Sequence, residues 1–299
     1  MKTLEMTGPG GREVLQYAER DEPRPGPAQV TVAVEHVGLN FADVLARRGI
    51  PGYATGRPFA PGLEVSGTVL ETGEDVEGTA TGDRVVAFTV NGTGMGEVAL
   101  AEANLTVRVP SRMDLAVATT VPLTWGTALG LANASHPGPG DSILVTSAAG
   151  GAGTALAATL RGHGALMIGG VGSPLKAGAL ADGCVPLLRG EGFVDEAKQM
   201  TAGGSFDVVF ESVGGPLLES VTGALAPGGA CFPTGRQRNH GPGPPIPGRI
   251  AEPQLDGDRI QHHQSRKKES QNGPAPHQRC LRLGLRWRPH QRPPHSRLE

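Results

Sequence analysis

The chain has 299 residues, of which 38% are hydrophobic and 19% charged, and its formal net charge at pH 7 is −2. This length leaves room for two domains. The three cysteines, Cys184, Cys231 and Cys280, are widely separated, which excludes a disulfide framework and a paired-cysteine zinc cluster. The chain has no unbroken run of 18 apolar residues and no signal-peptide core, so we expect a cytoplasmic protein without a membrane partner.

The first 120 residues have the pattern of an all-β module. Residues 28–37, 64–72 and 83–90 are rich in β-branched side chains and partly alternate apolar with polar positions. Glycine and proline separate these segments, as they do in short strands joined by turns. A further strand is predicted at the very start of the chain. We therefore place one domain at residues 1–120.

From residue 142 onward, apolar strands alternate with helical stretches. Residues 142–147 form a predicted buried strand, a turn of small residues follows, and residues 154–163 form an alanine-rich helix. A second apolar run at residues 166–171 completes a strand–helix–strand unit, which predicts a parallel sheet. Further strands are predicted at residues 184–187, 206–211 and 229–234. This order is typical of a doubly wound α/β, or Rossmann, domain, which we place at residues 121–235.

The turn between the first of these strands and its helix has the composition of a phosphate-binding loop. Small residues let the backbone approach a phosphate closely, and the amides at the helix N-terminus donate to it. The spacing Ala148-x-Gly150-x-x-Gly153 has alanine in place of the first glycine of the usual fingerprint, but the flanking strand and helix supply the required context. We expect a dinucleotide pyrophosphate to be bound by Ala149, Gly150, Gly151, Ala152 and Gly153.

The end of the second strand indicates which dinucleotide fits. An NAD site normally has an acidic residue about 20 residues after the turn, against the ribose hydroxyls. Here the chain reads Gly172-Ser173-Pro174-Leu175-Lys176, without a carboxylate that would repel a 2′-phosphate. Ser173 and Lys176 can donate to that phosphate, which favours NADPH over NADH as the cofactor. The alternative is that Lys176 is a solvated lysine near the start of a helix.

Six separated stretches, in this order, resemble one family. They are Val37-Gly38-Leu39-Asn40-Phe41-Ala42-Asp43-Val44, Pro61-Gly62-Leu63-Glu64-Val65-Ser66-Gly67, Gly82-Asp83-Arg84-Val85, Thr127-Ala128, the turn at residues 148–153, and Phe206-Asp207-Val208-Val209-Phe210-Glu211-Ser212-Val213-Gly214-Gly215. Over residues 1–234 the chain is similar to the zinc-independent quinone oxidoreductases of the medium-chain dehydrogenase/reductase superfamily.

This resemblance implies a fold and a reaction. The N-terminal domain is expected to be a GroES-like β-barrel that binds substrate, the Rossmann domain to bind NADPH, and the protein to form a homodimer. Hydride is expected to pass from NADPH to a small-molecule quinone or conjugated enone. An enoyl or alkenal reductase of the same superfamily is an alternative with the same hydride chemistry. A third alternative is a protein that binds the nucleotide without turnover.

Two catalytic candidates follow from the resemblance, and a third from its rarity in the chain. Asn40 and Asp43 match positions that face the nicotinamide and the substrate, and Tyr53 is one of only two tyrosines. We expect Asn40 to position the carbonyl or the nicotinamide, Asp43 to order the loop, and Tyr53 to line the pocket or donate its hydroxyl. Alternatively, Asp43 caps a short helix over residues 43–48 and Tyr53 only packs in a loop.

Three further residues are assigned to the cofactor by the same match. Thr127 resembles a threonine near the nicotinamide, although it can also be a helix residue that bonds its own backbone. Val213 falls in the last matching stretch. Leu188 stands where the family often has a tyrosine that packs on the adenosine side, and we expect the adjacent Arg189 to compensate through the phosphate.

Catalytic zinc is not expected. Zinc-dependent relatives have a cysteine in the region of residues 40–43 and a histidine before the glutamate, whereas this chain has Asn40 and Leu63. A catalytic zinc ion needs about three protein N, S or O ligands that converge on one point. We therefore assign no metal ligand.

The pattern stops near residue 235. Residues 236–299 hold 13 basic and 5 acidic residues and 10 prolines, whereas residues 1–235 hold 14 basic and 24 acidic residues. Such a tail buries too little apolar surface to offset its ordering entropy, so we expect it to be disordered and the Rossmann sheet to be incomplete. A gene read out of frame would have the same composition. Binding of nucleic acid, or of a metal through His262, His263 or Cys280, is not favoured because stacking aromatics and paired ligand spacing are nearly absent.

Overall fold

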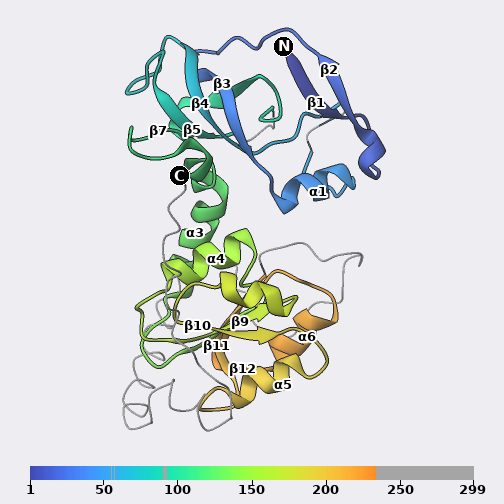
Figure 1. Ribbon diagram of the computed structural model, residues 1–299, viewed down its shortest axis with the longest axis vertical. Coiled ribbons are helices and arrows are strands. Elements are labelled where there is room, and N and C mark those ends of the chain that lie inside the picture. The colour runs from blue at the N-terminus through green and yellow to red at the C-terminus, as the bar shows by residue number, and fades with distance from the viewer. Residues whose placement is uncertain (55, 57, 90–92, 234–299) are drawn as a thin grey trace, which may run out of the picture. The chain divides into compact units, whose positions relative to one another are not determined.

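The structure is a computed structural model that describes residues 1–54, 56, 58–89 and 93–233 (Figure 1). The chain divides into two compact units, Met1–Thr127 and a second unit that begins at Ala128. The expected boundary at residue 120 falls inside a continuous helical stretch, Leu115–Ser135. The basic tail expected at residues 236–299 lies outside the described residues.

The first unit is built on an antiparallel sheet of five strands in the order β6-β3-β4-β5-β7. Valine side chains of its central strands, including Val30, Val32, Val65 and Val85, are fully buried and form the core. This arrangement confirms the predicted all-β module. The strands are β3 (Gln29–Gly38), β4 (Glu64–Thr72), β5 (Arg84–Phe88), β6 (Val98–Glu102) and β7 (Thr106–Arg108), with a 3₁₀ helix at Ala103–Leu105.

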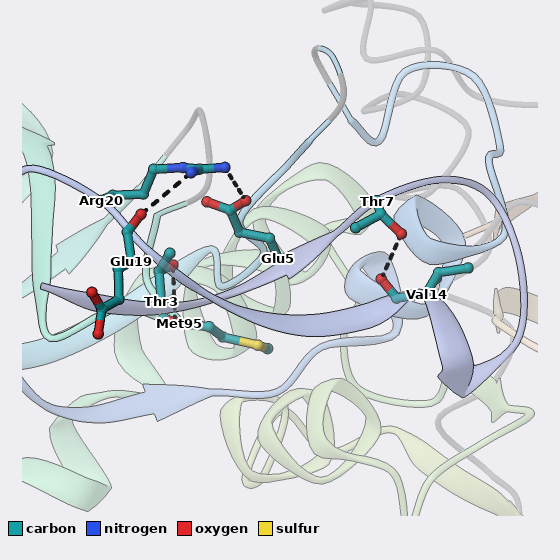
Figure 2. Close-up of polar contacts among 7 residues, drawn as sticks. All are labelled: Thr3, Glu5, Thr7, Val14, Glu19, Arg20 and Met95. Atoms are coloured by element: carbon teal, nitrogen blue, oxygen red, sulfur yellow. Dashed lines mark hydrogen bonds and ion pairs between the residues drawn. The ribbon is translucent and has the colours of Figure 1, made fainter.

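A hairpin precedes this sheet. β1 (Lys2–Met6) pairs antiparallel with β2 (Leu15–Glu19), and a 3₁₀ helix at Arg12–Val14 lies between them. The carboxylate of Glu5 accepts from Nη2 of Arg20 at 2.7 Å, as Figure 2 shows. The carbonyl of Met95 accepts from the Leu4 amide at 2.8 Å and, more distantly, from the Thr3 hydroxyl. The two contacts of Met95 join the hairpin to the loop before β6.

Helices close the first unit. α1 (Phe41–Arg47) follows β3, two residues earlier than the helix considered at residues 43–48. α2 (Leu115–Ala118), a π-helical turn (Val121–Trp125) and α3 (Gly126–Ser135) follow the sheet.

Within the part of the chain that the structure describes, one helical stretch, Leu115–Ser135, is long enough and apolar enough to cross a membrane, judged by length and composition alone. Its first turn belongs to the core of the first unit, because Leu115 and Ala118 pack with Val86 and Val109 of the sheet. Asp114 caps this turn, because its Oδ1 accepts from the amides of Ala116 and Val117. Length and hydropathy alone therefore do not distinguish a membrane span from a packed helix here.

The second unit holds a parallel sheet of five strands in the order β10-β9-β8-β11-β12. All five predicted strands are present, which confirms the Rossmann prediction. The strands are β8 (Ser142–Val145), β9 (Leu166–Val171), β10 (Cys184–Leu188), β11 (Phe206–Glu211) and β12 (Leu225–Pro233). The helices are α4 (Gly151–Thr159), α5 (Phe193–Gln199), α6 (Pro216–Gly223) and a 3₁₀ helix at Pro174–Ala179.

The central strand β8 of this sheet is buried on both faces. Ile143 and Val145 belong to the core that includes α4, whereas Leu144 between them belongs to the core that includes α5 and α6. Consecutive side chains of a strand point to opposite faces, so a strand covered on both faces is apolar throughout. This explains why the continuous run at residues 142–145 predicts a buried strand.

Candidate functional site

The loop between β3 and α1 is ordered by a buried carboxylate. Asp43 is 8% exposed, and its Oδ2 accepts from the Asn40 amide at 2.8 Å, which makes one half of a capping box. Its Oδ1 accepts from the Gly62 amide at 3.0 Å. Asp43 therefore both caps α1 and orders the loop, so the two roles considered from sequence are compatible.

The side chain of Asn40 is turned toward a second buried carboxylate. Its Nδ2 donates to Oε1 of Glu64 at 2.9 Å and lies 3.4 Å from the Gly38 carbonyl. Glu64 is 1% exposed, and its Oε2 accepts from the Leu123 amide at 3.0 Å. An ionised carboxylate only accepts hydrogen bonds, so this contact fixes the amide orientation of Asn40.

The remaining predicted residues of the first unit lie elsewhere in it. Tyr53 is partly buried and packs on the cluster of Met6, Ala46 and Phe59. This is the packing role considered for it, and its predicted contact with substrate stays a prediction. Thr127 lies in the first turn of α3 and is the last residue of the first unit.

In the second unit, the predicted pyrophosphate turn lies at the carboxyl end of β8 and opens α4. Gly150 is the N-cap, no side chain caps the helix, and its first turn has no acidic residue. Free amides and the positive end of the helix dipole make such a terminus suited to an anion. Ala149, Gly150, Gly151, Ala152 and Gly153 thus lie together where the sequence predicted.

The glycines of this turn have different roles. A Cβ at Gly153 would collide with the carbonyl oxygen of Ser147 and lie 2.8 Å from Cα of Ala148. Glycine is therefore needed there for the turn to pack against α4. A Cβ at Gly150 would lie 3.3 Å from the carbonyl oxygen of Ser147, a tight contact but a far milder one than at Gly153.

The residues predicted to select NADPH lie at the carboxyl ends of β9 and β10. Ser173 is the N-cap of the 3₁₀ helix but its side chain does not cap it, and Lys176 is exposed. A Cβ at Gly172 would lie 3.0 Å from Nη2 of Arg189, so the guanidinium lies against the end of β9. Nε of Arg189 is buried and finds no hydrogen-bond partner among the described residues.

The carboxyl end of β11 holds Val213 in a short glycine loop. Its amide donates to Oε1 of Glu211 at 2.6 Å, and the Gly214 amide donates to both oxygens of the same carboxylate, at 2.9 and 3.0 Å. Val213 therefore lies at the same edge of the sheet as the turn at Gly150 and as Arg189.

The two described thiols, Cys184 and Cys231, are poorly reactive near neutral pH. Burial raises the pKa of Cys184 to about 12, and burial together with the nearby Glu211 carboxylate raises the pKa of Cys231 to about 12. Neither is a nucleophile near neutral pH. Among the described residues, no three His, Cys, Asp or Glu side chains come together as a metal site.

Similarity to known proteins agrees with this geometry. Residues 26–111 match the alcohol dehydrogenase GroES-like domain. The chain is 34% identical over 221 residues to the quinone oxidoreductase-like protein 2 homolog of Nematostella vectensis, which covers 70% of this chain and 59% of that protein. The chain belongs to the medium-chain dehydrogenase/reductase superfamily. It falls in the quinone oxidoreductase-like group and spans about 59% of the length of this curated relative.

Two solved structures of quinone oxidoreductases place the fold in the same superfamily. The enzyme of Pseudomonas syringae pv. Tomato DC3000 has a TM-score of 0.73 and 26% identity, with 87% of this chain and 78% of that chain covered. The Escherichia coli enzyme, crystallised in complex with NADPH, has a TM-score of 0.72 and 26% identity, with 81% and 76% covered. The predicted GroES-like and Rossmann architecture is thereby confirmed.

Sequence reasoning missed three residues in this member of the superfamily. Glu64, Glu211 and Thr146 are each at most 1% exposed and hold site loops in place. The available signal was a charged residue in an apolar strand, since Glu and Asp are almost never fully buried unless paired. Glu64 begins β4 and Glu211 ends β11. Both lie inside stretches that resemble the family, but neither of them was assigned a role from the sequence.

Proposed function

We propose that this protein is an NADPH-dependent reductase that transfers hydride to a quinone or a conjugated enone without zinc. The observation that carries the proposal is Arg189, whose buried Nε lacks an acceptor among the described residues. It lies against Gly172 at the end of β9, and the segment that follows Gly172 holds Ser173 and Lys176 and no carboxylate. A buried donor without an acceptor is costly, and a phosphate oxygen would satisfy it.

The described residues fit the cofactor along the carboxyl edge of the parallel sheet. The uncapped start of α4 suits the pyrophosphate, because its first-turn amides have no side-chain acceptor. Arg189, Ser173 and Lys176 suit the 2′-phosphate on the β9 side of this turn. When bound, NADPH supplies the hydride, and the protein supplies orientation and electrostatics.

The role of Asn40 is narrower than the sequence indicated. Its Nδ2 protons are directed at Glu64 and Gly38. Its Oδ1 lies on the capping-box side, where the Asp43 amide donates to the main-chain carbonyl of Asn40 at 3.0 Å, so Oδ1 keeps the capacity to accept. We therefore assign Asn40 an accepting role toward a hydroxyl or N–H of the bound ligands. Polarisation of an acceptor carbonyl must come from other donors.

Zinc has no place in this proposal, because Asn40 and Leu63 stand where zinc-dependent relatives have ligands. Turnover of NADPH with a panel of quinones and conjugated enones tests the reaction itself. Activity that survives exhaustive chelation supports hydride transfer without a metal. Activity that is lost on chelation and restored by zinc overturns that part of the proposal.

The cofactor assignment is tested with Arg189→Met. Removing a charge-assisted hydrogen bond costs about 1.5–3 kcal/mol, so we expect NADPH affinity to fall at least about tenfold. NADH affinity should stay close to that of the wild type, because NADH has no 2′-phosphate. Isothermal titration calorimetry with both nucleotides measures the difference.

Arg161→Met is the matched control, since Arg161 lies in the same unit, beyond the C-terminal end of α4, and pairs with Asp182 on the surface. It should change neither affinity. Equal losses of NADPH and NADH affinity in the Arg189 variant would remove Arg189 from the 2′-phosphate site. Lys176→Glu provides a second test and should likewise weaken NADPH much more than NADH.

A further inference from the structure

Glu211 is a buried carboxylate that the sheet itself does not require. It ends β11 and is 1% exposed among apolar neighbours. Its oxygens accept from the amides of Val213 and Gly214 at 2.6–3.0 Å. Burying a charge is expensive unless hydrogen bonds compensate it, and among the described residues the compensating donors include two main-chain amides of one loop.

Thr146 connects this carboxylate to the neighbouring strand. Thr146 follows β8, is fully buried, and its hydroxyl oxygen lies 3.3 Å from Oε1 of Glu211. The same oxygen accepts from the Ser212 amide at 3.1 Å. Three consecutive amides, those of residues 212–214, are therefore turned inward toward Glu211 and Thr146.

The inward amides determine what the loop presents on its other side. In a planar trans peptide, the N–H of one residue and the C=O of the preceding residue point in opposite directions. The carbonyls of Ser212 and Val213 therefore point away from the Glu211 carboxylate. Gly214 and Gly215 have φ of +76° and +65°, a left-handed conformation that favours glycine and lets the loop take this shape.

The strand order places this loop at the crevice of the sheet. β8 has β9 on one side and β11 on the other, so the chain reverses its direction of winding between β8 and β11. Ligands of doubly wound sheets bind at such a switch point, beyond the carboxyl ends of the strands. The β9 side carries Ser173, Lys176 and Arg189. The β11 side is left for the other half of a dinucleotide.

We propose that Glu211, through Thr146 and the loop at residues 212–215, is a positioning residue for the nicotinamide half of the cofactor. This role rests on the proposed function. The outward carbonyls of Ser212 and Val213 are acceptors, and the carboxamide of nicotinamide has an NH₂ group that donates to such acceptors. Glu211 itself touches no ligand and acts by holding the loop.

The test compares two probes in the full-length chain. NADPH carries both halves of the cofactor, whereas adenosine 2′,5′-bisphosphate carries the 2′-phosphate half and lacks nicotinamide. In Glu211→Gln, an NH₂ group faces amides that also donate, so the loop loses its anchor. By calorimetry, NADPH affinity should fall about tenfold or more while affinity for adenosine 2′,5′-bisphosphate stays within about twofold, since the two halves bind separate loops.

Matched variants separate positioning from general damage. Glu219→Gln changes an exposed glutamate of α6 and should leave both affinities unchanged. Thr146→Val removes the hydroxyl at similar volume and should reproduce the selective loss in weaker form, whereas Thr146→Ser should restore it. This pair keeps the test decisive if Glu211→Gln does not fold.

The outcomes distinguish this role from the proposed function. Wild-type protein that binds neither probe overturns the proposed function and the positioning role with it. Wild-type protein that binds both, with variants that lose both equally or lose neither, overturns the positioning role alone. Selective loss of NADPH affinity supports it.

Discussion

Within the described residues, each of the two units has one glutamate that is only 1% exposed, and the two carboxylates take their partners from different distances along the chain. Glu64 is held by Asn40, 24 residues before it, and by the Leu123 amide, 59 residues after it. Among the described residues, Glu211 accepts from the amides two and three positions ahead, and Thr146 is a remote partner. The second site is therefore largely a local backbone structure, while the first exists only when the whole unit is folded.

The largest effect on the second unit is expected from a substitution at Gly153. In Gly153→Ala the new methyl group collides with main-chain atoms of Ser147 and Ala148, which cannot move aside as a flexible side chain can. We expect the second unit to lose about 3 kcal/mol of unfolding free energy, the upper end of overpacking costs. Denaturant unfolding followed by circular dichroism measures it. Gly130→Ala on α3, where a Cβ meets nothing within 4 Å, is the control.

Gly150→Val separates binding from folding in the same turn. Its Cβ lies 3.3 Å from the Ser147 carbonyl oxygen, a milder contact than at Gly153, so the unfolding midpoint should fall less than in Gly153→Ala. Nucleotide affinity should be lost for NADPH and NADH alike, because a side chain at the helix N-cap blocks close approach of the pyrophosphate. Retained binding of either nucleotide would mean that this turn is not the pyrophosphate site.

The same contrast explains how much the sequence could predict. The Rossmann strands and the turn at Gly150 and Gly153 follow from short patterns, because apolar runs and small residues act within a few positions. The strand limits shift by a few residues, and β12 begins at Leu225 rather than at 229, because edge pairing is set by the neighbouring strand. The contact of Asn40 with Glu64 had no such local signal.

Arg189 lies between these two cases. The resemblance assigned it to the cofactor phosphate, just after the predicted strand at residues 184–187, but only the packing of the sheet shows that its guanidinium lies against Gly172 with Nε buried. Tyr53 stands out in the sequence by its rarity, and the fold packs it on Met6 and Phe59, while its contact with substrate stays a prediction. Residue type alone does not tell a site residue from a core residue when the contacts come from distant segments.

The first unit can be weakened alone through Glu64→Gln. Both oxygens of Glu64 accept, from Asn40 and from the Leu123 amide, and glutamine offers only one acceptor. One buried donor is left facing an NH₂ group, which costs about 1–3 kcal/mol. Trp125, two residues beyond Leu123, reports unfolding of this region by its fluorescence when Trp287 is replaced by phenylalanine.

Glu71→Gln, on the exposed part of the same strand β4, should leave that fluorescence transition unchanged. Affinity for adenosine 2′,5′-bisphosphate should also be unaffected in Glu64→Gln, because every contact described for the 2′-phosphate half of the cofactor lies in the second unit. If Glu64→Gln lowered the unfolding free energy of the second unit as much as that of the first, the effect of Glu64 would not be confined to its own unit.

Thiol labelling offers the finest distinction between the units, because both described cysteines, Cys184 and Cys231, lie in the second one. Their pKa values near 12 keep the thiolate scarce in the folded state, so at pH 8 in a Cys280→Ser background labelling requires opening of the unit. We expect Gly153→Ala to speed labelling and Glu64→Gln to leave the rate unchanged. The pKa of each thiol is higher in the folded state than the value of about 9 expected in the unfolded state. Ionisation therefore favours the unfolded state as pH rises from 9 toward 12, so labelling of the wild type should also accelerate in that range. Faster labelling in Glu64→Gln at pH 8 would mean that loosening the first unit opens the second, and the contrast between a local and a long-range site would then not extend to stability.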